Sequence, residues 1–342
     1  MIKNNKKVKS SFSWFFKILL SAILIAFVCI APFTLLPNLL KEQAEVNRGE
    51  SYEYQGILEL WHIETFEGGS ASRANFLERE AINFEKTHKG TYIVIQTMSL
   101  EQFELNIKAQ KYPNMISFGI GVGDSFIEKL LELDNEGVRS DLANAGKFGS
   151  KQLAVPYILG GYALISNGNG KTGVGLKGTT NPLKALEQNK MQIATLYNDY
   201  NLDSYDAYDK FLKGNFETLL GTQRDVYRCY SRQQKGLLND ATYTFLEGYT
   251  DLVQYLSVFK GKDIEQKLCK EFVSQMISIN VQSKLKDYNL FSTIKDLTLY
   301  SDGLYRDFES VLKKNLKVDS AFLSLEQIQS QKAEAFKAVV KN

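Results

Sequence analysis

A strand–loop–helix–strand pattern at residues 56–94 places the strongest constraint on the fold of this 342-residue chain. A short apolar strand over residues 57–61 runs into a loop rich in glycine and serine. Residues 74–86 place apolar side chains on one helical face, and residues 91–97 alternate as a strand does. The pattern predicts a βαβ unit whose open loop follows its first strand, where α/β sheets bind ligands.

The composition is that of an ordinary globular protein with almost balanced charge. Hydrophobic residues make up 44% of the chain, which is enough for a packed core in one or two modest lobes. Lysine and arginine number 41 against 39 aspartate and glutamate, so the concentrated basic character of nucleic-acid-binding proteins is missing and we expect no nucleic acid partner. The 18 tyrosines and 21 phenylalanines are expected mostly in the core, although aromatic rings also line carbohydrate clefts.

The N-terminus predicts a membrane anchor. Several lysines precede an uncharged run over residues 18–40, which is long enough to cross a hydrocarbon core. The lysines favour a cytoplasmic N-terminus. We therefore expect a cytoplasmic basic tail (1–17), a single transmembrane helix (18–40), a polar stalk (41–55) and an extracellular remainder at the cell membrane.

Two alternatives to an uncleaved anchor stay open, namely a cleaved secretion signal and lipidation at Cys29. A cleavage site would place Cys29 and Ala31 at its key positions and Pro32 after the cut, which matches a signal peptide poorly. The remaining cysteines, Cys229 and Cys269, are interpreted as free, buried thiols, with one disulfide between them as the alternative.

Strands and helices alternate along the rest of the chain, which indicates an α/β class with largely parallel pairing. Asp124 is positioned to cap a helix over residues 125–133. A short strand is expected at residues 192–196, and the glycine-rich stretch at 167–180 is expected to be a loop.

Several segments, in their order along the chain, resemble the bacterial extracellular solute-binding proteins that serve sugar-type ABC importers (family 1). They are ILELWHIETFEG, FLEREAINFEKTHKG, YPNMISFGIG, AVPYILGGYALISN, FETLLGTQRDVYR, YTDLVQYLSVFK and VQSKLKDYNLFS. The resemblance implies an α/β, periplasmic-binding-protein-like (type II) fold with two lobes, preceded by the transmembrane helix. The first lobe would comprise residues 56–160 and about 252–342, and the second would comprise residues 161–251.

The resemblance also implies a function. The chain would bind a small solute, most simply a carbohydrate, between its lobes, without catalysis, cofactor or metal. Its partners would be this solute, the ABC permease subunits and the membrane. The segment 167–190 is shorter than in the family, so the second lobe is expected to be small. Since Trp14 and Trp61 are the only tryptophans, a sugar in the second lobe would stack on tyrosine.

Candidate ligand-binding residues follow from the strand ends and from the resemblance. They are Trp61, Glu64, Thr65, Phe66, Ser117, Phe118, Gly119, Tyr157, Gln223, Arg224, Tyr227 and Tyr249. Carboxylates, hydroxyls and guanidinium groups pair with sugar hydroxyls, and aromatic rings stack on sugar faces. The alternatives are a core position for Trp61, a surface ion pair for Arg224, and a simple bend, instead of a hinge, at Gly160 and Gly161.

Two other functions are weighed against transport. The same fold, with its short second lobe and uncleaved anchor, is compatible with a sensor or structural accessory at the cell surface. A secreted hydrolase is the third hypothesis, and it lacks support because the spacing shows no nucleophile–base or paired-carboxylate arrangement.

Overall fold

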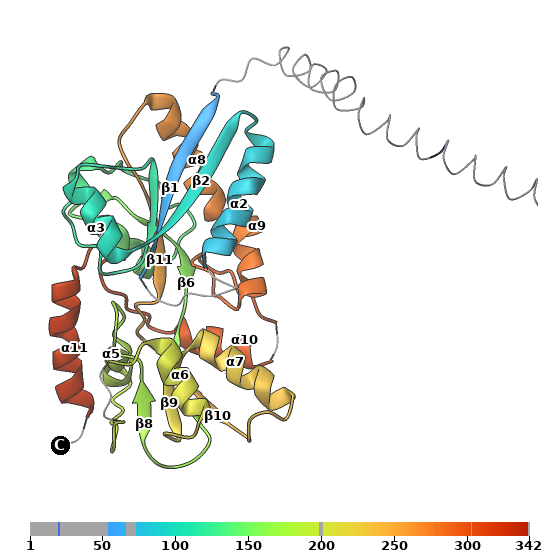
Figure 1. Cartoon of the computed structure of the whole chain (residues 1–342), viewed down its shortest axis with the longest axis vertical. Helices are drawn as coiled ribbons and strands as arrows, with labels where there is room; N and C mark the ends of the chain where they lie inside the picture. Colours follow the sequence, from blue (N-terminus) through green and yellow to red (C-terminus); the bar gives the residue numbers. More distant parts are fainter. Residues whose placement is uncertain (1–19, 21–53, 66–72, 198–200, 302, 341–342) are drawn as a thin grey trace, which may run out of the picture. The chain divides into compact units, whose positions relative to one another are not determined.

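The computed structural model describes residues 20, 54–65, 73–197, 201–301 and 303–340, which are coloured in Figure 1. The chain separates into two compact units, Met1–Glu53 and Tyr54–Asn342. The predicted tail and anchor, and most of the stalk, lie outside the described residues apart from Leu20. Within the part that is described, no helix has the length and apolar character needed to cross a membrane. The anchor therefore stays a prediction.

The first sheet of the second unit contains five strands in the order β2-β1-β3-β11-β6. Their bounds are β1 Gly56–Glu64, β2 Thr91–Ser99, β3 Met115–Phe118, β6 Val155–Leu159 and β11 Val253–Val258. β1 pairs in parallel with β2, from Gly56 opposite Thr91 to Glu64 opposite Ser99, and also with β3. The βαβ unit predicted at residues 56–94 is thus confirmed.

Three helices pack against this sheet or beside it (Figure 1): α2 Arg73–Thr87, α3 Leu100–Lys108 and α8 Asp263–Met276. The apolar spacing predicts the buried face of α2 except at Ile82: Phe76, Leu77, Ala81 and Phe84 are buried, whereas Ile82 is 54% exposed. The Phe84 ring meets Phe272 of α8 edge-on, with 5.5 Å between centroids, so α2 and α8 share one apolar layer.

The second sheet contains four strands in the order β10-β7-β9-β8. Its strands are β7 Tyr162–Ser166, β8 Thr172–Val174, β9 Thr218–Thr222 and β10 Thr242–Phe245, and the helices around it are α5 Pro182–Gln188, α6 Ser204–Leu212 and α7 Gln223–Gln234. Two later helices, α10 Gly303–Leu312 and α11 Leu325–Val339, complete this end of the unit (Figure 1). The short elements elsewhere are η1 Ile127–Lys129, α4 Ser140–Ala143, η2 Asn144–Gly146, β4 Lys147–Phe148, β5 Lys151–Gln152, α9 Ile279–Gln282 and η3 Ser283–Tyr288.

The expectation of largely parallel pairing is wrong, because both sheets are mixed. β11 runs antiparallel to β3 and β6, and β7 runs antiparallel to β9 and β10, whereas β8 and β9 are parallel. β11 enters the first sheet directly from the second one, instead of through a helix that packs on its own sheet. Its direction is therefore not that of a βαβ unit.

Three local expectations are wrong within the described residues. The stretch 167–180 is not all loop, because it contains the strand β8, Thr172–Val174. In place of a helix over residues 125–133 there is only the single turn η1, because Leu131 N donates to Val258 O at 2.8 Å and the chain follows the end of β11. Residues 192–196 form isolated bridges instead of a strand, to Val340 from Ile193 and to Thr172 from Leu196.

The chain crosses between the two sheets at Gly160–Gly161 and returns through Leu252. Gly160 N donates to Leu252 O at 2.7 Å, which ties the two crossings together. A Cβ on Gly160 would lie 2.7 Å from Gln223 Oε1, and one on Gly161 would lie 2.9 Å from the Phe308 ring. Both glycines are thus required by close packing, and a hinge at this point stays a prediction.

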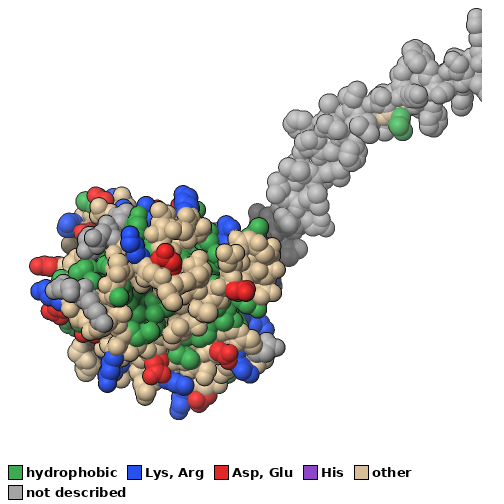
Figure 2. Space-filling model, turned by 90° about the horizontal axis from the view of Figure 1, so that it is seen from below, with side chains coloured by type: hydrophobic (Ala, Val, Ile, Leu, Met, Phe, Trp, Pro, Cys, Tyr) green, Lys and Arg blue, Asp and Glu red, His purple; other side chains and the backbone are tan. Residues whose placement is uncertain are grey.

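Acidic and basic side chains are scattered among one another over the face shown in Figure 2, around a patch of apolar atoms. This mixture agrees with the nearly balanced composition. In the interior, Cys229 and Cys269 are both free and buried, which confirms the interpretation as thiols.

Candidate ligand-binding site

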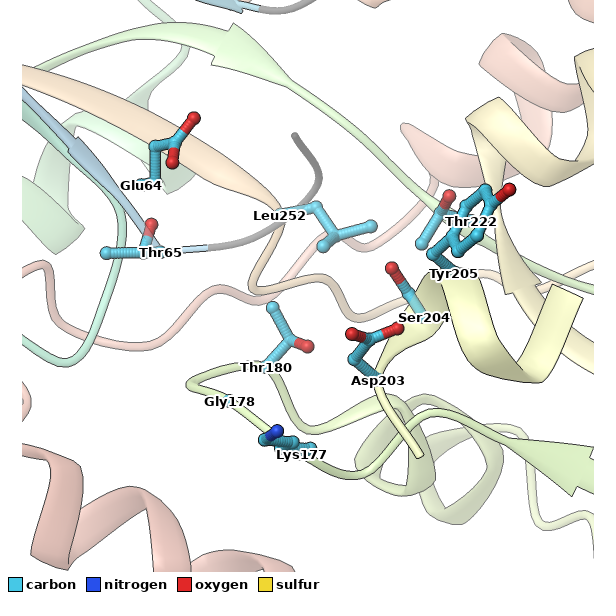
Figure 3. Close-up of a pocket in the computed structure, with 10 residues that line it drawn as sticks. All are labelled: Glu64, Thr65, Lys177, Gly178, Thr180, Asp203, Ser204, Tyr205, Thr222 and Leu252. Carbon is cyan, nitrogen blue, oxygen red and sulfur yellow. The ribbon is translucent and has the colours of Figure 1, made fainter. Parts of the chain in front are cut away.

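A pocket of about 310 Å³ opens between the two sheets. Figure 3 shows the ten residues that line it, Glu64, Thr65, Lys177, Gly178, Thr180, Asp203, Ser204, Tyr205, Thr222 and Leu252. Glu64 and Thr65 come from the end of β1, Leu252 comes from the return crossing, and the other residues belong to the second sheet and its connections. The ends of strands from both sheets thus meet at this pocket, as open α/β sheets arrange their ligand sites.

One wall is the loop that follows β8, residues 175–181. Leu176 N and Lys177 N both donate to Leu202 O at 2.9 Å, which holds this loop beside the start of α6. Thr179 Oγ1 donates to Thr65 O at 2.6 Å and so joins the loop to the end of β1. A Cβ on Gly121, whose φ is +112°, would lie 2.6 Å from Thr179 Cγ2, so this residue must be glycine for the loop to approach.

The start of α6 forms the adjoining wall. Asp203 caps the helix by accepting a hydrogen bond from Asp206 N at 2.8 Å, which fixes the Asp203 carboxylate at the pocket. Among the lining residues that the structure describes, Tyr205 is the only aromatic side chain, and it is 62% exposed. The Arg228 guanidinium lies 5.7 Å from its ring centroid. This contact supports the ring from α7 and leaves most of its surface open to solvent.

Tyr205, Lys177, Thr180 and Asp203 were not among the sequence candidates. One signal for Asp203 and Tyr205 was present in the sequence, because an aspartate directly before a helix marks an N-cap, and helix starts often face ligand sites in α/β folds. The loop at Lys177 and Thr180 offered no comparable signal, since a glycine-rich stretch does not reveal what it packs against.

Of the four candidates at the end of β1, two line the pocket. Glu64 is exposed there, and Thr65 is buried at its edge. Trp61 is 5% exposed and meets Phe103 edge-on, so it occupies the core position that was its alternative. Phe66 lies outside the described residues.

The candidates on β3 and β6 are buried beneath the pocket. Ser117 Oγ lies 2.8 Å from Tyr157 OH and 2.9 Å from His62 Nδ1, and it accepts from Gln254 Nε2 at 2.9 Å. Burial, followed by the nearby Arg73 charge, lowers the pKa of His62 to about 3, so this imidazole is neutral at physiological pH. Ser117 and Tyr157 thus belong to a polar network inside the first sheet.

The two residues after Ser117 differ in their surroundings. Phe118 is fully buried among the rings of Phe126, Tyr255 and Phe322. Gly119 N donates to Thr65 Oγ1 at 3.1 Å. Gly119 therefore orients a lining residue through its backbone.

The candidates on the second sheet do not line the pocket. Gln223 is buried, and its Oε1 accepts from Gly161 N at 3.0 Å at the first crossing. Arg224 is half-buried, and Tyr227 is 46% exposed on the surface of α7. Tyr249 is buried and donates to Asp319 Oδ2 at 2.7 Å. Direct ligand contact by these residues stays a prediction.

A buried carboxylate sits directly behind the pocket. Asp251, next to the lining residue Leu252, accepts hydrogen bonds from Tyr162 OH and Asn181 N, both at 2.5 Å. Burial raises the pKa of Asp251 to about 6, although both hydrogen bonds act to lower it. Asp251 lies next to Leu252 at the return crossing. Its carboxylate thus links that crossing to Tyr162, just after the first crossing, and to Asn181 at the end of the loop 175–181.

No protein-family model matches the chain, and a search of curated proteins finds no match. Solved structures do match. The GacH receptor of Streptomyces glaucescens GLA.O, solved unliganded and with acarbose, is 17% identical with a TM-score of 0.59, over 83% of this chain and 94% of that one. The sugar-binding protein MalE of Xanthomonas citri is 12% identical with a TM-score of 0.60, over 82% and 91%. Iron-bound HitA of Pseudomonas aeruginosa is 14% identical with a TM-score of 0.54, over 82% and 99%.

The chain has the fold of these binding proteins. The resemblance inferred from its sequence segments is therefore confirmed at the level of the fold. The matched proteins hold different ligands, since one was solved with acarbose and another with iron. At such low identities the fold alone is shared, so the ligand must be argued from the pocket of this chain.

Proposed function

We propose that this chain is a solute-binding protein that captures a small carbohydrate in the pocket between its two sheets. The observation that carries the proposal is the lining itself. Among the described residues, hydroxyl groups of threonine and serine, the carboxylates of Glu64 and Asp203, the ammonium of Lys177 and the exposed ring of Tyr205 line the pocket together. Such a lining offers donors and acceptors to vicinal sugar hydroxyls and one aromatic surface to a sugar face.

The size of the pocket favours a short ligand. Ligand pockets commonly enclose about 300–1,000 Å³, and the 310 Å³ here lies at the lower end of that range. This is room for roughly one or two sugar rings. An extended oligosaccharide would have to leave most of its rings outside.

The proposed mechanism is closure of two lobes around the ligand. A sugar that contacts Glu64 and Thr65 on one side and Asp203 and Tyr205 on the other would bind the closed arrangement better than an open one. The population of the closed state then rises by this difference in affinity. The lobes would be residues 56–160 with about 252–342, and residues 161–251, as expected from the sequence.

The cellular setting is part of the same proposal. The basic N-terminus and the apolar run at 18–40 support an anchored protein whose binding unit lies outside the cell. An importer that recognises a loaded binding protein by its closed shape would supply the permease subunits as partners. A sensor at the cell surface is the alternative, and it would use the same pocket with a different partner.

A ligand screen by thermal unfolding tests the binding function. We expect a disaccharide present at about 100 times its Kd to stabilise the full-length protein by about 2.7 kcal/mol, which raises Tm by about 5 °C. The panel contains monosaccharides, disaccharides and trisaccharides, with ferric ion as the comparison suggested by the iron-bound structure. A Tm that responds to iron and to no sugar would contradict the proposal.

Replacement of Tyr205 by alanine is expected to weaken binding of the best sugar about tenfold, because stacking on an aromatic ring is lost while the rest of the pocket remains. Tyr92→Ala is the matched control, since Tyr92 is also exposed, lies on β2 and does not line the pocket. Isothermal titration of both variants measures the effect. Equal affinities for Tyr205→Ala and Tyr92→Ala would show that the ring at the pocket does not stack on the ligand.

A further inference from the structure

Helix α11 buries a lysine on its apolar face. This helix packs along α5, as Figure 1 shows, and its buried residues are Ile328, Lys332, Ala335 and Val339. Lys332 is only 7% exposed. An ammonium is expensive to bury among apolar neighbours, so its position calls for a specific partner.

The partners of Lys332 are two backbone carbonyls of the pocket loop. Its Nζ donates to Leu176 O at 2.7 Å and to Gly178 O at 2.6 Å. These carbonyls stand on either side of Lys177, and both Lys177 and Gly178 line the pocket. The Lys332 side chain thus binds the loop 175–181 through the two carbonyl groups on either side of the lining residue Lys177.

The other contacts and the glycines of the loop 175–181 explain why the two hydrogen bonds from Lys332 are important for its conformation. The amide groups of Leu176 and Lys177 donate to Leu202 O, and Thr179 Oγ1 donates to Thr65 O after the end of β1. The loop contains two glycines, Gly175 and Gly178, and the latter has a φ of +98°. A segment of such composition is disordered easily unless hydrogen bonds hold it.

We propose that Lys332 is a positioning residue for the ligand site, which holds the loop 176–178 in the conformation that presents Lys177 to a bound sugar. The inference rests on the proposed binding function and concerns the same pocket. Lys332 itself does not line the pocket, so it acts through the loop.

The surroundings of Lys332 shift the pKa of its amine, so its hydrogen bonds should depend on pH. Burial lowers its pKa to about 8, and the negative charge of Asp251 acts in the opposite direction. The other charged groups nearby are Lys184 and Asp319, which pair at 2.7 Å, and Lys184 also contacts Gln331 beside Lys332. Above about pH 8 the amine is neutral and its two hydrogen bonds lose their charge assistance.

Hydrogen exchange of the ligand-free, full-length protein tests the positioning directly. In Lys332→Met we expect the amides of residues 176–178 to exchange about tenfold faster than in the wild type, while exchange in β1 and β3 is unchanged. Lys337→Met is the matched control, because Lys337 is exposed on the same helix. Lys332→Arg keeps the charge and the donors and is expected to stay close to the wild type. Unchanged exchange at 176–178, or an equal increase throughout the protein, would overturn the proposal.

Affinity gives the second readout, with maltose and xylobiose as probes. We expect Lys332→Met to bind the better of the two about tenfold more weakly, and Lys332→Arg to show no loss when the pH rises from 7 to 9, in contrast to the wild type. Wild-type affinity retained by Lys332→Met would overturn the inference. If neither sugar binds the wild type, the result counts against the proposed function instead. The exchange experiment then still tests whether Lys332 holds the loop 176–178 in place.

Discussion

Replacement of Gln282 by methionine is expected to lower the free energy of unfolding by about 4 kcal/mol, because one buried amide serves several chain segments at once. Gln282 is fully buried in α9. Its Nε2 donates to Tyr157 O at 2.8 Å and to Met276 O at 2.9 Å. Its Oε1 accepts from Ser292 Oγ at 2.9 Å and from Thr293 N at 3.0 Å.

The size of this effect comes from the groups that would be left behind. Methionine has nearly the shape of glutamine, so little packing is lost, but Tyr157 O and Met276 O would each lose a donor. Thr293 N would lose its acceptor inside the core. Each unsatisfied buried group costs about 1–3 kcal/mol, and some of these groups find new partners. A loss of about 4 kcal/mol is therefore expected from several such groups together.

Urea denaturation of the full-length protein measures this loss. Gln329→Met is the control, since Gln329 lies exposed on α11 and its replacement should change the free energy of unfolding by less than about 0.5 kcal/mol. A similar small change for Gln282→Met would mean that the network around α9 contributes nothing to stability.

The local pattern of the sequence was sufficient to predict the first βαβ unit. The alternation in β2 and the spacing of Phe76, Leu77 and Phe84 in α2 are short-range properties of the sequence. The folded protein buries side chains with the same strand and helix periods, so these patterns predict the elements correctly. The direction of β11 is a different kind of property. It depends on the route of the chain between two sheets, which no local period encodes.

The pocket was only partly predictable for the same reason. Glu64 and Thr65 were found because they follow a recognisable strand. Thr179 and Thr65 are 114 positions apart, and their hydrogen bond sets one wall of the pocket. Ser117 was expected at the ligand, yet partners 40 and 137 positions away, Tyr157 and Gln254, enclose it in the core. Such contacts become visible only when the whole chain is folded.

Asp251→Asn is expected to change how stability depends on pH, by about 2 kcal/mol between pH 4 and pH 7. The carboxyl group has a pKa of about 6 in the folded protein and about 3.9 when unfolded. In this window the folded state binds more protons than the unfolded state. The stability contributed by the protonated form is therefore present below about pH 4 and lost as the pH rises through 6.

The difference between wild type and variant isolates this effect, since the other titrating groups are common to both. We expect the free energy of unfolding of Asp251→Asn, measured in urea at pH 4, 5, 6 and 7, to rise by about 2 kcal/mol relative to the wild type across the series. Asp307→Asn, at an exposed position, is the control variant. A difference that stays constant with pH for Asp251→Asn would mean that its two hydrogen bonds outweigh burial. Asp251 would then remain charged throughout the range and would hold Tyr162 and Asn181 by ionic hydrogen bonds.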